Sequence, residues 1–88
     1  MTTYTKYKST CGRSVVMGDK QKLAKVFFGK REDNGTWDIW VESTRSGGMM
    51  GNFGKKNITV DELNNIDSDP YDDMIFDKKA FALFGLEV

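Results

Sequence analysis

The sequence predicts an α+β fold, in which a small antiparallel sheet of three or four strands comes first and two or three short helices follow and pack on it. Three observations predict this fold. β-prone runs flank the turn pair Asn34-Gly35, a helix-capping sequence spans Thr59–Glu62, and the pair Asp69-Pro70 is typical of a second helix start. The 88 residues suffice for one core, so we assign residues 1–88 to a single domain.

The first two strands are expected over residues 3–10 and 13–17. The first run is polar but rich in Thr and Tyr, and the second is short and apolar, as is typical of strands. Gly12 and the pair Gly18-Asp19 punctuate the two runs. We expect the Lys-rich first strand at the edge of the sheet, because charged edges resist pairing with other molecules.

A hairpin is expected from residues 21–32 and 36–44, because Asn34-Gly35 between them supplies the positive φ angles of a two-residue type I′ turn. Such a turn places Arg31 opposite Asp38. A three-residue loop would instead turn the carboxylates of the second strand toward the apolar face, where burial is costly. The two-residue turn leaves one face almost uniformly apolar, and we predict that this face is core: Ala24, Val26, Phe28, Trp37, Ile39 and Val41.

The last third of the chain is expected to be helical. Thr59–Glu62 is a capping box, and the short helix that it begins ends near Ile66. The pair Asp69-Pro70 supplies an N-cap and a first helical residue that needs no N–H. Gly85 suits the C′ position that ends a helix. The pattern leaves open whether residues 70–84 form one helix or two.

The composition excludes several classes of function. The chain has no His and one Cys, Cys11, so imidazole chemistry, His-based metal sites and an internal disulfide are all excluded. No apolar run approaches the length of a membrane span or a signal peptide, which favours a soluble, cytoplasmic protein. We expect no enzyme activity, no cofactor and no metal.

Charge is balanced in sum but separated along the chain. Residues 1–32 hold eight basic and two acidic residues, residues 33–60 balance, and residues 61–88 hold two basic and eight acidic residues. Such a separation can steer a charged partner. Equally, the two ends of the chain can pack together and neutralise each other.

The segment 45–57 is predicted to be a flexible Gly-rich loop between the sheet and the helices. It does not match a phosphate-binding loop, because its glycine and lysine spacing differs from that motif. Its apolar side chains either cap the core or offer adaptable contacts to a protein partner, and we favour the partner. The candidate partner-binding residues of this segment are Met49, Met50, Phe53, Lys55 and Lys56.

The acidic stretch that follows is a second candidate for partner binding. Asp69, Asp73 and Asp77 would line one face of a continuous helix, where with Asp72 they could engage a basic groove on a nucleic-acid-handling protein. The alternative is that these carboxylates serve the helix start and its dipole. A calcium loop beginning at Asp67 is disfavoured, because it lacks the sixth-position Gly and the final Glu.

A third candidate site is an aromatic platform with cationic neighbours, which could bind single-stranded nucleic acid by stacking and phosphate contacts. We favour the alternative that helices cover one sheet face and draw its large aromatic rings into the core. The candidate nucleic-acid-binding residues are Lys6, Lys8, Lys22, Lys25, Phe27, Lys30, Arg31 and Trp40.

Together these features predict a small non-enzymatic protein-binding module that acts as a regulator or inhibitor by occupying a surface on a macromolecular partner. Small cofactor-free chains of this kind include phage-encoded proteins that block host machinery. They offer only an analogy between classes of protein. The alternative is a nucleic-acid-binding module. A homodimer formed through an open sheet face is compatible with either.

Overall fold

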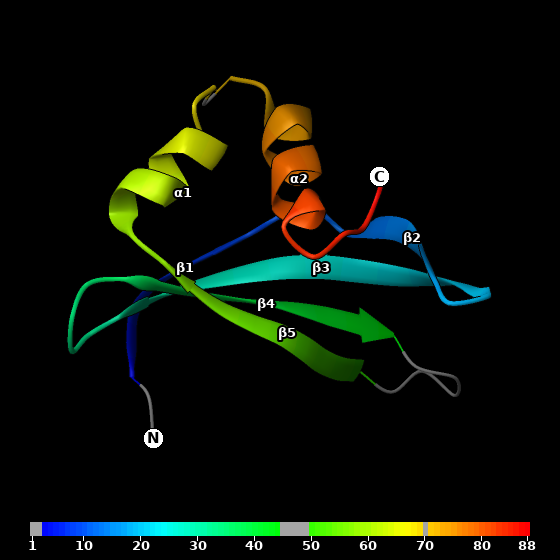
Figure 1. Ribbon diagram of the computed structural model, residues 1–88, viewed down its shortest axis with the longest axis horizontal. Helices are drawn as coiled ribbons and strands as arrows, with labels where there is room; N and C mark the ends of the chain where they lie inside the picture. The colour runs from blue at the N-terminus through cyan, green and yellow to red at the C-terminus, as the bar shows by residue number, and fades with distance from the viewer. Residues whose placement is uncertain (1–2, 45–49, 70) are drawn as a thin grey trace.

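The protein is described here by a computed structural model that covers residues 3–44, 50–69 and 71–88. In this part of the chain, five strands form one antiparallel sheet, and two C-terminal helices lie on the same side of it (Figure 1). The predicted α+β class is therefore confirmed. The described sheet has five strands where three or four were expected, and the two described helices fall within the two or three expected.

The strands are β1 (Tyr4–Ser9), β2 (Arg13–Met17), β3 (Lys20–Arg31), β4 (Trp37–Thr44) and β5 (Met50–Ile58). Their order across the sheet is β1-β3-β4-β5, and β2 also pairs with β3. The long strand β3 thus holds β1 along one half of its edge and β2 along the other half. This places the Lys-rich β1 at an edge, as predicted.

The β3–β4 hairpin keeps the predicted faces but not the predicted register. Phe28 lies opposite Ile39, two positions away from the expected pairing. The Arg31 N–H donates to the Thr36 carbonyl at 2.7 Å, so the connection is a four-residue loop. A type I′ turn needs positive φ at both central residues, and only Gly35, at +71°, has it. Because side chains alternate with period two, a shift of two residues leaves each one on its original face.

The predicted core face is buried against the helices. The side chains of Val26, Phe28, Ile39 and Val41 are fully enclosed. Phe28 contacts Phe76 of the second helix, with 5.4 Å between the ring centroids. The remaining buried apolar side chains of the described residues are Val15, Ala24, Trp37, Ile58, Leu63, Ala80 and Phe81.

The first helix, α1 (Val60–Ile66), begins and ends as predicted, and the Thr59–Glu62 capping box is formed in both directions. The predicted start of the second helix is wrong. Helix α2 (Asp73–Ala82) is one helix whose N-cap is Asp72, and the Asp69 carboxylate instead accepts a hydrogen bond from the Tyr71 N–H in the preceding turn.

The C-terminal end of α2 follows the prediction. Gly85 has φ of +71°, its N–H donates to the Ala82 carbonyl at 3.0 Å, and the Leu86 N–H donates to the Phe81 carbonyl at 3.1 Å. This pair of bonds around a left-handed glycine is the Schellman motif.

The predicted 45–57 loop is also corrected. Residues 50–57 belong to β5, which pairs antiparallel with the outer edge of β4. Residues 45–49, including Met49, lie outside the described residues. The strand tolerates its glycines because pairing with β4 supplies the backbone hydrogen bonds that a loop would leave to water.

Two ion pairs join the basic N-terminal strands to the acidic helical region. Lys8 contacts Asp67, and Arg13 forms a salt bridge with Asp77 at 2.7 Å. At these positions the two ends of the chain do neutralise each other. Among the described residues, no helix combines the length and the apolarity that crossing a bilayer requires.

Candidate functional site

The sheet face turned away from the helices is the candidate site, and we call it the open face. Both described helices lie on the opposite side of the sheet (Figure 1). The residues of the open face alternate with the buried ones along each strand. Its members are Tyr4, Tyr7, Val16, Leu23, Lys25, Phe27, Arg31, Asp38, Trp40, Glu42, Asn52, Lys55 and Asn57.

Four aromatic rings form a row across the open face. Tyr7 meets Tyr4 edge-on with 5.6 Å between centroids, Tyr4 lies 5.6 Å from Trp40, and Trp40 stacks on Phe27 at 6.0 Å. The Tyr4 ring lies over Gly29, where an added Cβ would approach it to 2.8 Å. A glycine within a strand often marks such a close approach, so Gly29 was a signal that could have placed Tyr4.

A buried carboxylate, Asp38, anchors Tyr4 within this row. Asp38 is only 1% exposed, and it accepts hydrogen bonds from the Tyr4 hydroxyl at 2.8 Å and from the Asn57 amide at 2.9 Å. The cations of Lys55 and Arg31 lie 3.6 and 3.8 Å from the same carboxylate. The sequence predicted Arg31 as a partner of Asp38. It did not predict Tyr4, Asn57 or Lys55 as partners.

The pKa values of this cluster follow from its contacts. Burial by itself raises the pKa of Asp38, but the hydrogen bonds from Asn57 and Tyr4 and the charges of Lys55 and Arg31 outweigh it, so the pKa is lowered. Burial, followed by the hydrogen bond to Asp38, raises the pKa of Tyr4. Asp38 is therefore an ionised anchor that orients Tyr4 from beneath the open face.

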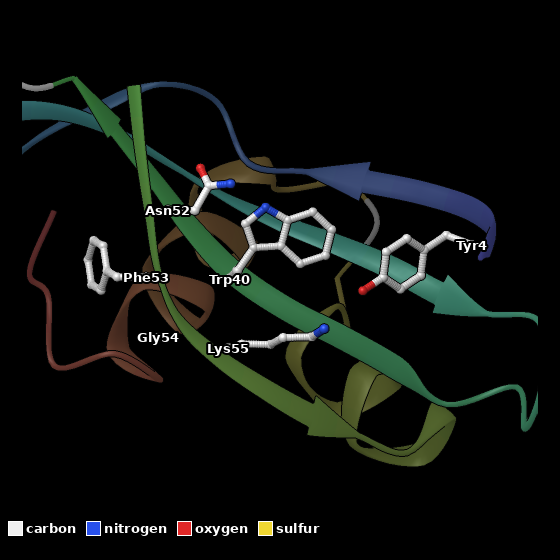
Figure 2. A pocket seen from close by; sticks show the side chains of 6 residues that line it. All are labelled: Tyr4, Trp40, Asn52, Phe53, Gly54 and Lys55. Carbon is white, nitrogen blue, oxygen red and sulfur yellow. The ribbon is translucent and has the colours of Figure 1, made fainter. Parts of the chain in front are cut away.

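Two hollows flank the Trp40 side chain. The first, of about 350 Å³, is lined by Tyr4, Trp40, Asn52, Phe53, Gly54 and Lys55, and we call it the Lys55 hollow (Figure 2). The second, of about 360 Å³, is lined by Tyr7, Lys8, Ser9, Phe27, Trp40 and Glu42, and we call it the Glu42 hollow. Trp40 thus forms part of the wall of both hollows.

A β-bulge shapes the Lys55 hollow. Ile39 pairs with Lys56 and Val41 with Phe53, so two residues of β5, Gly54 and Lys55, lie opposite Trp40 alone. Gly54 has φ of +70°, as expected for the first residue of a bulge of this kind. The extra residue directs Lys55 onto the open face, and Figure 2 shows its side chain running beside Trp40 toward Tyr4.

The predicted partner-binding residues of β5 are separated by the strand. Lys55 is on the open face, whereas the Lys56 ammonium lies on the helix side, 5.7 Å from the centre of the Phe84 ring. Phe53 is 39% exposed at the outer end of the Lys55 hollow. Met50 is the first residue of β5, and Met49 falls outside the described residues.

The predicted ridge of three carboxylates does not form. Asp69 precedes the helix, and Asp77 is 2% exposed, where the Arg13 guanidinium donates two hydrogen bonds to it at 2.7 and 2.9 Å. Asp72 is the N-cap of α2, and Asp73 lies in its first turn. Asp72 and Asp73 therefore serve the helix start, as the alternative interpretation held, whereas Asp77 belongs to an ion pair with Arg13.

The predicted nucleic-acid-binding residues fall on two faces. Phe27, Trp40, Lys25 and Arg31 share the open face. The other four basic residues occupy positions that alternate to the helix side: Lys6, Lys8, Lys22 and Lys30. The two aromatic rings predicted as a platform are thus brought together, but four of the six predicted cations are not with them.

Comparison of the chain with family models, with curated proteins and with solved structures finds no match. In the part of the chain that the structure describes, no group of three or more Cys, Asp or Glu is placed to hold a metal ion. The geometry of the open face therefore carries the functional argument.

Proposed function

We propose that the protein is a non-enzymatic protein-binding module that docks on a macromolecular partner through the aromatic row of the open face. By occupying a surface of that partner, the module would act as a regulator or inhibitor. The observation that carries this proposal is the stacked pair of Trp40 and Phe27 on a sheet face that neither described helix covers. Large aromatic side chains in such positions are typical of the residues that dominate binding energy in protein interfaces.

Exposed apolar side chains on the same face support a protein partner. Tyr7 is 67% exposed, Val16 66% and Leu23 56%. Together with the aromatic row, they extend apolar surface along β1, β2 and β3. Contiguous apolar surface of this kind commonly marks a protein interaction site in a soluble protein.

The charge of the open face favours a protein over a nucleic acid. The Arg31 guanidinium lies 2.7 Å from Asp33 and 3.8 Å from Asp38, and Lys25 lies directly opposite Glu42 in the β3–β4 register. A nucleic-acid-binding surface gains most of its affinity from basic residues that neutralise phosphates. The open face, where acids offset most of its cations, is poorly suited to that role.

A capture experiment with matched variants tests the proposal. Tagged wild-type protein, Trp40→Ala and Tyr71→Ala are incubated with the same extract of the native cell, and the retained proteins are identified by mass spectrometry. Tyr71 is an exposed aromatic residue outside the open face, so its variant is the matched control. We expect one partner that the wild type and Tyr71→Ala retain, and that Trp40→Ala binds at least about 30-fold more weakly.

Oligonucleotide binding is the opposing outcome. Single- and double-stranded oligonucleotides are titrated against the wild type at two salt concentrations. Tight binding with a steep salt dependence that Trp40→Ala abolishes would replace the proposed function with nucleic-acid binding. A partner that Trp40→Ala retains at full affinity would exclude the open face as the docking surface.

A further inference from the structure

The two hollows beside Trp40 have similar size and aromatic walls but opposite charge. The Lys55 hollow presents an ammonium and the Asn52 amide beside the rings of Tyr4 and Trp40, and Phe53 and Gly54 line its edge. The Glu42 hollow presents a carboxylate that has no cation within 4.0 Å among the described residues. The Lys8 ammonium lies on the helix side of the sheet, over the Phe76 ring and beside Asp67, so it does not enter this second hollow.

The Lys55 ammonium is available to a ligand although Asp38 lies near it. Their separation of 3.6 Å is longer than a hydrogen bond between an ammonium and a carboxylate, and the Lys55 side chain is 58% exposed. Asp38 itself is beneath the surface, where Tyr4 and Asn57 already donate to both of its oxygens. A ligand in the hollow therefore meets the cation and not the carboxylate.

The bulge fixes the backbone from which this cation extends. Gly54 is pressed against the Phe84 ring on the helix side, where an added Cβ would come within 2.7 Å of a ring carbon. The backbone at Gly54 is thus fixed between the segment that follows α2 and the open face, and it places the next residue, Lys55, beside the Trp40 indole. A cation next to an aromatic wall is complementary to a planar group that carries a negative charge.

From this arrangement we infer that the Lys55 hollow is a binding subsite for an aromatic group with an adjacent carboxylate, which the protein partner would present as an aromatic side chain next to an acidic one. The aromatic ring lies against Trp40, and the carboxylate accepts a hydrogen bond from the Lys55 ammonium. The Glu42 hollow disfavours the same group, because its own carboxylate repels it. This inference rests on the proposed function and names the partner chemistry of the same face.

Small probes test the subsite without knowledge of the partner. Indole-3-acetate supplies the ring and the carboxylate, indole-3-acetamide has nearly the same shape without the charge, and tryptamine carries the opposite charge. Each is titrated into isotopically labelled protein, and backbone amide and indole N–H shifts are followed by NMR. We expect indole-3-acetate to shift the Asn52–Lys55 amides and the Trp40 indole, with indole-3-acetamide binding about fivefold more weakly.

Matched lysine variants assign the charge preference. Lys55→Gln should bind the acetate and the acetamide equally, whereas Lys55→Arg and Lys56→Gln should keep the preference for the acetate. Lys56 is the proper control because its ammonium lies on the other side of the sheet, over Phe84. The spectrum of each free variant shows that it is folded.

The outcomes separate this inference from the proposed function. Equal affinity for the acetate and the acetamide in the wild type, a preference for tryptamine, or shifts confined to the Glu42 hollow would each overturn the subsite. Partner capture that depends on Trp40 would then still support the open face as a docking surface. If instead the subsite is found but capture does not depend on Trp40, the proposed function fails and the hollow is a small-molecule site alone.

Discussion

The indole of Trp40 lies almost parallel to the ring of Phe27, with 9° between the two planes and 6.0 Å between the centroids. The two rings belong to neighbouring strands and are directly opposite each other in the β3–β4 register. Stacked aromatic pairs of this geometry contribute about 0.5–1.5 kcal/mol beyond the area that they bury. Trp40 is therefore held in one orientation although it is only half-buried.

The two tryptophans of the chain should respond differently to a quencher. Trp37 belongs to the buried core, whereas Trp40 is half-buried on the open face. In the single-tryptophan variants, we expect the emission of Trp37→Phe, which keeps Trp40, to be red-shifted and strongly quenched by acrylamide. The emission of Trp40→Phe should be blue-shifted and resist quenching. Equal quenching of the two variants would mean that the open face is covered in solution.

Stability should fall in acid because of Asp38. Its pKa is lowered in the folded protein, so the carboxylate favours folding above its unfolded pKa, and this stability is lost as the pH falls below about 4. Asp33, whose pKa is lowered mainly by its hydrogen bond with Arg31, acts in the same direction. We expect the free energy of unfolding, measured in urea between pH 7 and pH 3, to decrease less steeply in Asp38→Asn than in the wild type.

Tyr4→Phe provides the control for this pH dependence. It removes one hydrogen bond to the carboxylate and should lower stability at pH 7 by about 1.5–3 kcal/mol, while leaving an ionised Asp38. Its pH profile should therefore lie between those of the wild type and Asp38→Asn. An unchanged profile in Asp38→Asn would show that other carboxylates govern acid unfolding.

Gly54→Ala should destabilise the fold more than Gly35→Ala does. Gly54 and Gly35 both have positive φ, at +70° and +71°, so alanine is strained by about 1–2 kcal/mol at either position. A Cβ at position 54 also meets Phe84 at 2.7 Å, whereas one at position 35 meets no heavy atom within 4 Å. The difference in urea midpoint between the two variants measures this contact, and equal midpoints would show that Phe84 moves aside at no cost.

Removing one partner of the Arg13–Asp77 pair should destabilise the fold more than removing both. Arg13→Ala leaves the buried Asp77 carboxylate without its cation, so we expect a clear loss of thermal stability. The double variant Arg13→Met with Asp77→Leu removes both charges and should recover most of that loss in thermal unfolding. A double variant as unstable as Arg13→Ala would show that the pair itself, and not the unpaired charge, determines stability.

The sequence predicts the two faces of the β3–β4 hairpin better than its register. Alternation of apolar and polar residues identifies Val26 and Ile39 as core. This assignment stays correct when the strand register shifts by two residues, because side chains alternate with period two. The register depends on whether Asn34 adopts positive φ, and its side chain instead accepts hydrogen bonds from the N–H and hydroxyl of Thr36. That local competition cannot be read from the pair Asn-Gly alone.

The errors elsewhere have tertiary causes. The segment of β5 is rich in glycine and has the composition of a loop, and it is a strand because β4 offers an unpaired edge to it. Asp69 and Asp72 are equally good N-caps by residue type. The choice between them depends on packing, because a start at Asp72 lets Phe76 and Phe81 face the sheet.

The candidate site was predicted only in its centre. Phe27 and Trp40 follow from alternation along two adjacent strands, which the sequence does show. Tyr4 and Asp38 meet across three strands, and their contact depends on a shift in the β1–β3 register between Tyr4 and Lys6. No local pattern in the sequence specifies that irregularity.

The strand order also bears on how the chain folds. β2, β3, β4 and β5 each pair with their neighbour in sequence, whereas the Lys8–Asp67 and Arg13–Asp77 pairs join residues 59 and 64 positions apart. Local pairings of low contact order form early, so we expect the meander to precede the attachment of the helical segment. Arg13→Ala should then accelerate unfolding in stopped-flow experiments and leave the refolding rate unchanged, and a slowed refolding would place the helices within the folding nucleus. The ion pairs between the ends of the chain thus form after the transition state for folding. They set the unfolding rate, and hence the lifetime of the folded protein, and not the folding rate.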